Sequence, residues 1–359
     1  MLTMQTVLFR ADGGGIYSMA MGHLFRSVRL AGVLSKRGVR CLFIMRNYPE
    51  GVKFVTNAGF AVDLLDPAIS EEEEVSYVVS HAIQLDALLY IDIRFSIKRL
   101  IEEASKEYIP TVVYEDVCGE DILPTVLINP TLTAQNEKGY EDREDMQLLI
   151  GTDYLVLDPF IEDYARSSFS PEINKLFLCF GGADPCNISN RILKILLAKK
   201  DEYQITLILG PSFKYHSDIK KTVRYMGFDK RVTVISNCDD LYSILSTTDA
   251  AITAGGNIVY ESISLNIPTF VLPSIDYEAV NMTPLIDAGL ISGIKEDIAN
   301  VKDVILEEEI DCFINEPDSR KRLFDKACLE HLSGGIFRVV EVICKTQRLY
   351  RRRIQTKHI

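Results

Sequence analysis

Short apolar runs rich in β-branched residues alternate with amphipathic helical patterns along most of this 359-residue chain. Such alternation is typical of parallel sheets whose two faces are covered by helices. The runs expected to form strands are Thr6–Arg10, Val39–Met45, Ala61–Leu65, Ala87–Asp92, Pro110–Tyr114, Thr125–Asn129, Lys175–Phe180, Gln204–Leu209, Val232–Ile235, Ala250–Thr253 and Thr269–Leu272. The pattern therefore predicts an α/β protein with two doubly wound domains in series.

The alternation weakens between Pro130 and Asn174 and restarts at Lys175, which places a domain boundary in that stretch. We expect a first domain over residues 1–158, a linker over 159–174, a second domain over 175–332, and a C-terminal helix with a basic tail over 333–359. Ligands of doubly wound folds bind beyond the carboxyl ends of the strands. An active site in the cleft between the two domains is therefore the expectation.

Composition narrows the class of partner. A net charge of -12 argues against a nucleic-acid-binding body, because phosphate contacts need concentrated Lys and Arg. Eight scattered cysteines without a C-x-x-C pair, and the lack of a leader or a membrane-spanning run, predict a reduced, cytoplasmic protein. The basic C-terminal cluster favours a solvated helix end, with contact to acidic lipid or to a partner as the alternative; it comprises Arg348, Arg351, Arg352, Arg353 and Lys357.

The first expected strand leads through Arg10-Ala11-Asp12-Gly13-Gly14-Gly15 to a helix that begins at Gly22-His23. The positive end of a helix disfavours imidazolium, so His23 is expected to stay neutral and able to accept a proton near neutral pH. The alternative is a histidine that only hydrogen-bonds a neighbour at the start of the helix. The other histidines lack this setting, and no metal-binding spacing competes with it.

Two glycine-rich loops follow strands in the second half: Phe180-Gly181-Gly182 and Thr253-Ala254-Gly255-Gly256-Asn257. Paired glycines let the backbone approach a phosphate, and the following helix offers free N–H groups to its oxygens. Ordinary turn chemistry is the alternative. Neither a P-loop nor a G-x-G-x-x-G follows a strand, which disfavours ATP hydrolysis and NAD binding. Glu261 lies where its carboxylate could bind a ribose diol, or could be a favourable charge at the start of a helix.

Several segments together resemble a known family. They are Arg10-Ala11-Asp12, Gly22-His23 with Arg26, Gly151-Thr152-Asp153-Tyr154, Phe180-Gly181-Gly182-Ala183-Asp184-Pro185-Cys186-Asn187, and Ile252-Thr253-Ala254-Gly255-Gly256 with Tyr260-Glu261. In this order they resemble the UDP-sugar hydrolases of pseudaminic acid biosynthesis and the related spore-coat polysaccharide biosynthesis proteins. The resemblance implies two Rossmann-like domains facing a cleft, as in glycosyltransferase-B enzymes.

The resemblance also implies a site. It assigns His23 to the water that attacks the anomeric carbon, and Asp12 to orienting that histidine or holding sugar hydroxyls. It places Gly181, Gly182, Gly255, Gly256 and Asn257 at the diphosphate, Glu261 at the ribose, and Arg10, Gly22 and Asn281 on the sugar side. It implies neither a metal nor another cofactor.

Three functions follow as hypotheses. The first is a UDP-sugar hydrolase that releases UDP and a free amino-deoxy sugar with inversion, for surface-glycan or sialic-acid-like sugar synthesis. The second is an inverting glycosyltransferase of the same fold, in which an acceptor hydroxyl replaces water. The third is a nucleotide-sugar-binding protein without catalysis. Family members carry a glycine where Met19-Ala20-Met21 stands and an Asn-Gln pair where Asn281-Met282 stands, so the sugar is left open.

Overall fold

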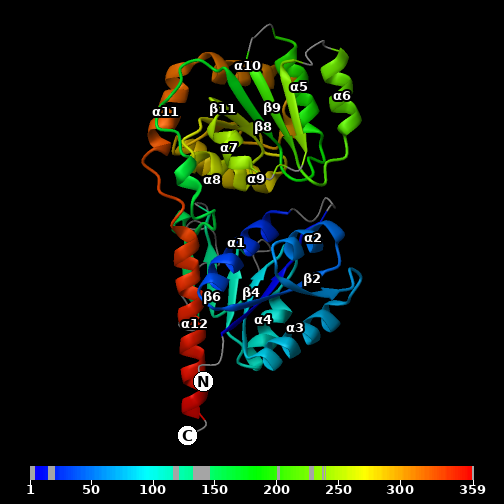
Figure 1. Ribbon diagram of the computed structural model, residues 1–359, viewed down its shortest axis with the longest axis vertical. Helices are drawn as coiled ribbons and strands as arrows, with labels where there is room; N and C mark the ends of the chain where they lie inside the picture. Colours follow the sequence, from blue (N-terminus) through cyan, green and yellow to red (C-terminus); the bar gives the residue numbers. More distant parts are fainter. Residues whose placement is uncertain are drawn as a thin grey trace. The chain divides into compact units, whose positions relative to one another are not determined.

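The computed structural model describes residues 5–14, 21–115, 121–131, 146–199, 203–225, 230–236, 238 and 240–357, with side chains as far as residue 350. The described residues between 5 and 159, together with 334–357, form one compact unit, and residues from 160 to 333 form a second (Figure 1). Cys118, the loop before Met21 as far back as Gly15, and the charged side chains of the tail beyond Tyr350 lie outside the described part.

The first unit contains one sheet of seven parallel strands in the order β3-β2-β1-β4-β5-β6-β7. The strands are β1 (Thr6–Ala11), β2 (Arg40–Arg46), β3 (Ala61–Leu65), β4 (Ala87–Asp92), β5 (Thr111–Tyr114), β6 (Val126–Asn129) and β7 (Gln147–Ile150). β1 and β4 are neighbours, although β2 and β3 lie between them in sequence. The sheet therefore reverses its winding at this pair, and ligands of such sheets bind beyond that point.

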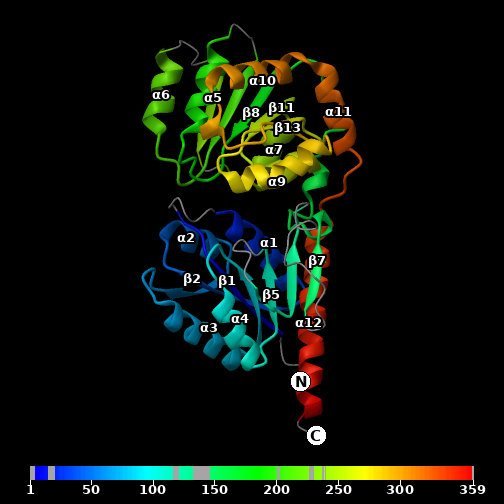
Figure 2. The ribbon, with the colours of Figure 1, turned by 180° about the vertical axis from the view of Figure 1, so that it is seen from behind.

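Helices cover both faces of this sheet (Figure 2). They are α1 (Gly22–Lys36), α2 (Pro49–Asn57), α3 (Glu71–Leu85), α4 (Lys98–Lys106) and α12 (Gly335–Lys357). Side chains of α1, α2 and α12 share a core with Val7 and Phe9 of β1, whereas α3 and α4 share the opposite core with Leu8. The helices that follow β1 and β4 thus leave on opposite faces, which opens a crevice between the two strand ends.

The helix α1 begins at Gly22, as its sequence predicts, and ends where Gly38 takes a positive φ of 78° just beyond it. Leu24, Ala31 and Leu34 are fully buried against the sheet, and Val28 packs partly buried beside them. On the same helix His23 and Arg26 are buried three residues apart. That spacing puts both on one face, directed at the strand ends.

The second unit contains a sheet of six parallel strands in the order β10-β9-β8-β11-β12-β13. The strands are β8 (Lys175–Cys179), β9 (Gln204–Leu209), β10 (Val232–Ser236), β11 (Ala250–Thr253), β12 (Thr269–Val271) and β13 (Ser292–Gly293). The helices are α5 (Ile188–Leu197), α6 (His216–Tyr225), α7 (Leu241–Ser246), α8 (Asn257–Ser264), α9 (Asp276–Asp287), α10 (Asp303–Asn315) and α11 (Pro317–Ala327). Its winding reverses between β8 and β11, the two strands that precede the glycine loops.

All the strands expected from the sequence are present, with ends that differ by at most one residue. The prediction of two doubly wound α/β units is therefore confirmed. The sequence prediction missed two further strands, β7 and β13. β7 is half-buried and only four residues long, and β13 is a two-residue strand of Ser292 and Gly293, so neither has a hydrophobic period long enough to be recognised. Within the described residues no helix is both long and apolar enough to cross a bilayer.

Candidate active site

His23 lies at the first turn of α1 with both ring nitrogens engaged. Nδ1 is 2.5 Å from Oδ1 of Asp92, the last residue of β4, and both side chains are buried. Nε2 accepts a hydrogen bond of 3.0 Å from Nε of Arg94. The histidine is therefore fixed by residues from the end of the neighbouring strand.

These contacts define the tautomer. An ionised carboxylate only accepts hydrogen bonds, and a guanidinium only donates them. Nδ1 must therefore carry the proton that it shares with Asp92, and Nε2 must present its lone pair to Arg94. Arg26 Nη2 also lies 2.9 Å from Nδ1, but it donates to Asp92 Oδ1 at 2.5 Å, so its closeness to Nδ1 reflects two donors that converge on one oxygen.

Asp92 is the anion at the centre of this cluster. Burial raises its pKa, but the charges and hydrogen bonds of Arg26 and His23 outweigh burial and hold the pKa of Asp92 below its ordinary value. Arg26 donates to both Asp92 oxygens, from Nε and Nη2, each at 2.5 Å, and its Nη1 donates to Glu115. The Arg26 guanidinium also lies 4.7 Å above the ring of Tyr114. Asp92 is thus ionised at neutral pH.

Asp12, predicted to orient His23 or to hold sugar hydroxyls, lies in a different cluster. Its carboxylate accepts from Arg10 Nη2 at 2.7 Å and from the backbone N–H of Arg46 at 2.7 Å. Arg10 also donates to Glu74 of α3; burial lowers its pKa, but the two carboxylates outweigh burial and leave the pKa above the ordinary value. The carboxylate at His23 is therefore Asp92, and the Asp12 cluster ties together the ends of β1 and β2.

Arg10, predicted on the sugar side, is fully buried, so its guanidinium does not reach the surface in this structure. Among the described residues its Nη1 has no hydrogen-bond partner. Gly22 is the first residue of α1, and Asn281 is buried in α9 of the second unit. The structure therefore places Gly22 beside His23 in the sequence and fold, and Asn281 in the unit that carries the glycine loops.

The glycine loop after β8 contains a buried carboxylate, that of Asp184. Gly181 has a φ of 82°, and the Gly182 carbonyl accepts from Ser212 at 2.9 Å. Asp184 is buried and accepts from the first N–H groups of α5, those of Ile188 and Ser189, at 2.8 Å each. The N-terminus of α5 is thus already satisfied by a side chain, so an anion at this loop would rely on the loop backbone.

The loop after β11 differs. Within the described residues no side chain caps α8, which begins at Asn257 directly after Gly256. A Cβ on Gly256 would meet nothing within 4 Å, so the loop faces open space. The Gly255 N–H is instead taken by Glu278, whose Oε2 also accepts from the backbone and hydroxyl of Ser274. The α8 start therefore combines a free helix end with an approachable backbone, the usual form of an anion site.

Glu261 is buried in the second turn of α8, beyond the first turn where a carboxylate stabilises a helix start. Its interpretation as a helix-start charge is therefore wrong. The Tyr242 hydroxyl donates to Glu261 Oε1 at 3.1 Å. The side chain lies one turn below the open end of α8.

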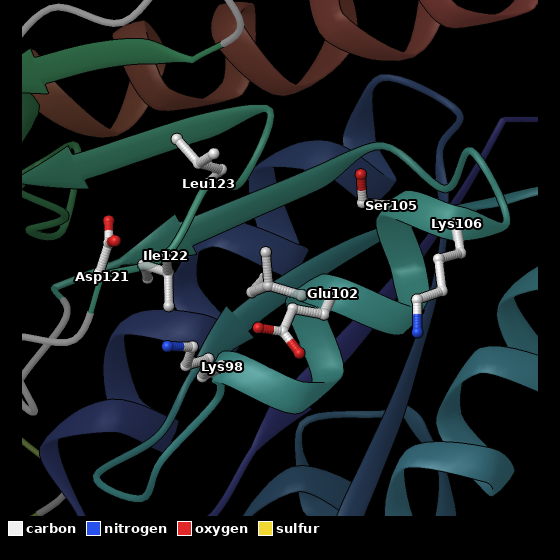
Figure 3. A pocket seen from close by; sticks show the side chains of 8 residues that line it. Lys98, Glu102, Ser105, Lys106, Asp121, Ile122 and Leu123 are labelled. Carbon is white, nitrogen blue, oxygen red and sulfur yellow. The ribbon is translucent and has the colours of Figure 1, made fainter.

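A pocket of about 410 Å3 opens between α4 and the segment before β6, and Figure 3 shows its lining. The lining residues are Lys98, Ile101, Glu102, Ser105, Lys106, Asp121, Ile122 and Leu123. None of them is a predicted site residue, and the mixture of charge signs indicates no particular ligand. In the part of the chain that the structure describes, no three His, Cys, Asp or Glu side chains gather as a metal site would require.

Sequence reasoning missed Asp92, Arg94 and Glu115 and assigned no role to Arg26. A signal existed for two of them: the apolar run that forms β4 ends in Asp92 and continues to Arg94, charged residues at the carboxyl end of a buried strand. The spacing of His23 and Arg26 also indicated a shared helix face. No signal linked β4 to β1, because that neighbourhood depends on strand order.

Sequence comparison finds similarity to two proteins described below. The spore coat polysaccharide biosynthesis protein SpsG of Bacillus subtilis is 25% identical over 291 residues, which cover 78% of this chain and 80% of SpsG. The uncharacterized protein MJ1062 of Methanocaldococcus jannaschii is 25% identical over 275 residues, which cover 72% of this chain; the chain spans only 54% of that relative. No family model matches the chain.

Structure comparison gives longer matches. MurG of Acinetobacter baumannii has a TM-score of 0.64 at 12% identity, over 95% of this chain and 99% of MurG. The glycosyltransferase of kitacinnamycin has a TM-score of 0.64 at 14% identity, over 96% of this chain and 99% of that one. The chain has the glycosyltransferase-B fold. HepE of Anabaena, solved in complex with UDP, shares this fold with a TM-score of 0.59 at 12% identity, over 95% of this chain and 100% of HepE.

The predicted glycosyltransferase-B architecture is thus confirmed, and the resemblance to spore-coat polysaccharide proteins is supported by SpsG. The narrower resemblance to pseudaminic-acid-pathway hydrolases stays a prediction.

Proposed function

We propose that this protein is a UDP-sugar hydrolase that releases UDP and a free amino-deoxy sugar with inversion at the anomeric carbon, in the synthesis of a surface polysaccharide or a sialic-acid-like sugar. Water attacks the anomeric carbon and gives its proton to His23 Nε2, while the bond from that carbon to the diphosphate oxygen breaks and UDP leaves. The fold and the similarity to SpsG support a nucleotide-sugar substrate. HepE, a protein of this fold, was solved with UDP and with UDP-glucose.

The observation that carries the proposal is the contact between His23 Nδ1 and the buried, ionised carboxylate of Asp92. A general base needs a free lone pair on one nitrogen and a means to stabilise the positive charge that it gains. Asp92 supplies the second at 2.5 Å, and the tautomer leaves the lone pair on Nε2; because this lone pair accepts from Arg94, the proposal requires Arg94 to give it up to the attacking water. A histidine that served only to start a helix would need neither.

The second unit supports the nucleotide side of the proposal. We propose that the diphosphate binds at the uncapped start of α8, against the backbone of Gly256 and Asn257. The Gly181-Gly182 loop contributes backbone only, because Asp184 already occupies the start of α5. Glu261 accepts from the ribose hydroxyls one helical turn away. UDP leaves as a stabilised anion held by helix N–H groups, so this chemistry uses no further cofactor.

Measuring UDP release from a panel of UDP-sugars, with and without added acceptors, tests the proposal. Release without an acceptor supports hydrolysis. Release that depends on an acceptor instead identifies a glycosyltransferase in which His23 takes the proton of a hydroxyl. Binding of UDP without any turnover would make the protein a nucleotide-sugar-binding protein.

His23→Ala should reduce turnover by at least about 10²-fold, the smallest usual contribution of a general base, while UDP affinity stays close to that of the wild type. His216→Ala, an exposed histidine on α6, is the matched control and should keep wild-type turnover. Wild-type turnover in His23→Ala would remove the histidine from the mechanism.

We further propose that the protein acts in the reducing cytoplasm, where its cysteines stay unpaired. No disulfide joins the cysteines that the structure describes. The basic tail then offers a peripheral contact to acidic lipid, for a substrate or product passed to a membrane-bound enzyme.

A further inference from the structure

We propose that Glu115 is a positioning residue for the base: its carboxylate compensates the charge of Arg26, so that the carboxylate of Asp92 is left to stabilise His23 when the ring takes a proton. The proposal rests on the proposed role of His23. It adds a second carboxylate to the reaction, one that acts through Arg26 and Asp92 and not on the substrate.

The fold brings these groups together at one edge of the first sheet. β4 and β5 are parallel neighbours, so their carboxyl ends meet at the same edge. Asp92 is the last residue of β4, and Glu115 directly follows β5. Arg26 of α1 contacts both carboxylates: its Nε and Nη2 donate to Asp92 at 2.5 Å each, and its Nη1 donates to Glu115. One cation is therefore shared by two anions from neighbouring strand ends.

Charge balance is the first observation. His23, Arg26 and Asp92 are buried, and the side chain of Glu115 is 13% exposed. Arg26 and Asp92 alone have no net charge, so a proton on His23 would leave a net positive charge in a buried group, which is costly. With Glu115 included, the group carries one negative charge beside a neutral ring and none beside an imidazolium. Glu115 therefore favours the protonated ring.

The other groups at this cluster do not replace Glu115. Arg94 donates to His23 Nε2, but it is a cation and is half-buried, so solvent screens its charge more than that of Arg26. Tyr90 of β4 and Tyr114 of β5 also face the cluster; burial is the main cause that raises the pKa of both hydroxyls, so both stay uncharged at neutral pH. The charged groups that the described contacts place around the ring are Asp92, Arg26, Arg94 and Glu115.

The backbone of Glu115 is the second observation. Its φ of 59° lies in the left-handed region, which costs a residue with a Cβ about 1–2 kcal/mol. Its N–H donates to the carbonyl of Ile128 in β6 at 2.7 Å, so the neighbouring strand holds this conformation in place. A glycine would adopt it without strain, but would remove the carboxylate from Arg26. Strain that is kept at a residue whose side chain binds a buried cation is typical of a functional position.

The experiment compares full-length wild-type protein with Glu115→Gln, which keeps an acceptor oxygen for Arg26 and removes the charge. Asp86→Asn is the matched control. Asp86 also has a positive φ, of 48°, but it is exposed and lies at the other end of β4, roughly 20 Å from Asp92. The ¹⁵N resonances of His23 report the pH at which half of the rings carry the extra proton, the midpoint of the titration.

Loss of a nearby negative charge disfavours the imidazolium. We therefore expect the His23 midpoint to fall by about 0.5–1 pH unit in Glu115→Gln and to stay in place in Asp86→Asn. Glu115→Asp keeps the charge and should stay closer to wild type than Glu115→Gln. A midpoint that is the same in Glu115→Gln and wild type, or a ring that takes up no proton over the pH range in which the wild type is folded, overturns the proposal.

Wild-type protein supplies a test that needs no variant. The ¹³Cδ resonance of Glu115 should show an inflection at the His23 midpoint, because a proton on the ring changes the field at a coupled carboxylate. The ¹³Cγ resonance of Asp86 should show none at that pH. A Glu115 resonance without the inflection overturns the proposal, even if Glu115→Gln does not fold.

Turnover separates this proposal from the proposed function. In Glu115→Gln the acidic limb of kcat/KM for UDP release should move to lower pH with the midpoint. The rate above that limb should fall by less than about tenfold, because the base is weaker but keeps its tautomer. Wild-type protein that releases no UDP from any donor contradicts the proposed hydrolase, whereas the titrations decide on Glu115 without turnover.

Discussion

Asp92→Asn is the sharpest test of the site, because it removes one charge while it keeps the shape of the side chain. Asp92 accepts three hydrogen bonds of 2.5 Å, one from His23 and two from Arg26, and it is completely buried. An asparagine has a single acceptor oxygen, so at least one donor loses its partner. Arg26 keeps Glu115, which limits the loss.

The size of the stability change follows from these contacts. Removing one partner of a buried ion pair costs about 3–5 kcal/mol when the other is stranded, and a lost charged hydrogen bond about 1.5–3 kcal/mol. With Glu115 still in place, we expect the free energy of unfolding to fall by about 3 kcal/mol, measured by urea denaturation at pH 7. Because the folded pKa of Asp92 is lowered, this contribution is present above the ordinary aspartate pKa of about 3.9 and is lost as the pH falls through the lower folded value. The difference between wild type and Asp92→Asn should therefore shrink below about pH 4.

The catalytic effect has a separate cause. An amide N–H placed against His23 Nδ1 favours the tautomer with the proton on Nε2, which leaves no lone pair for the attacking water. The same carboxylate-to-amide change in a catalytic triad lowers kcat by about 10⁴-fold. We expect a loss of this order in UDP release, with UDP affinity little changed.

Asp12→Asn is the matched control for this prediction. It also removes a buried charge beside an arginine in the first unit, but it does not touch His23. It should destabilise the fold while the proton on His23 stays at Nδ1, as read by ¹⁵N NMR. If Asp92→Asn keeps that proton at Nδ1 and releases UDP at the wild-type rate, the reasoning about the base is refuted.

Three further predictions concern the packing of glycines, the role of Glu261 and the tail. Gly210→Ala should lower the free energy of unfolding, measured in urea, by about 1–3 kcal/mol, because its Cβ would lie 2.4 Å from the Cα of Gly182. Gly32→Ala, whose Cβ would meet nothing within 4 Å, should raise that free energy by up to about 1 kcal/mol. The reverse order of stabilities would contradict the packing argument. Glu261→Gln should weaken UDP binding about tenfold by calorimetry, since a charged acceptor is lost, and an unchanged dissociation constant would return Glu261 to a structural role beside Tyr242. Replacing the tail arginines 351–353 by glutamate should abolish any cosedimentation with anionic vesicles at low salt; equal sedimentation of both proteins would exclude an electrostatic contact.

Sequence reasoning predicted the strands well because most of them are apolar runs that the fold buries, as in Val7–Phe9 or Ala250–Thr253. It also selected His23, because a histidine at the start of a helix after β1 is a local feature. It could not find Asp92, since the closeness of β4 to β1 depends on strand order across about 80 residues. The local sequence pattern therefore predicts the helices and strands and one member of the His23–Asp92 pair, whereas the other member depends on the strand order.

The two glycine loops show the same limit on a smaller scale. Both looked like phosphate loops in sequence, and only the structure distinguishes them. Asp184 closes the start of α5, and Glu278 comes from α9 to take the N–H of Gly255. The first is a local contact, because Asp184 lies four and five residues before the N–H groups that it accepts from; the second is a contact across 23 residues that no short pattern encodes.

Because α12 is translated last, the order of synthesis affects how the first unit folds. Its Ile336, Val339, Val340 and Ile343 belong to the same core as Val7 and Phe9 of β1, although the whole second unit is translated between them. A ribosome therefore completes the chain of the second unit before the first can bury its α1 face. The nascent first unit therefore keeps an apolar surface uncovered until α12 is made, and a chain that stops before α12 should leave that surface exposed.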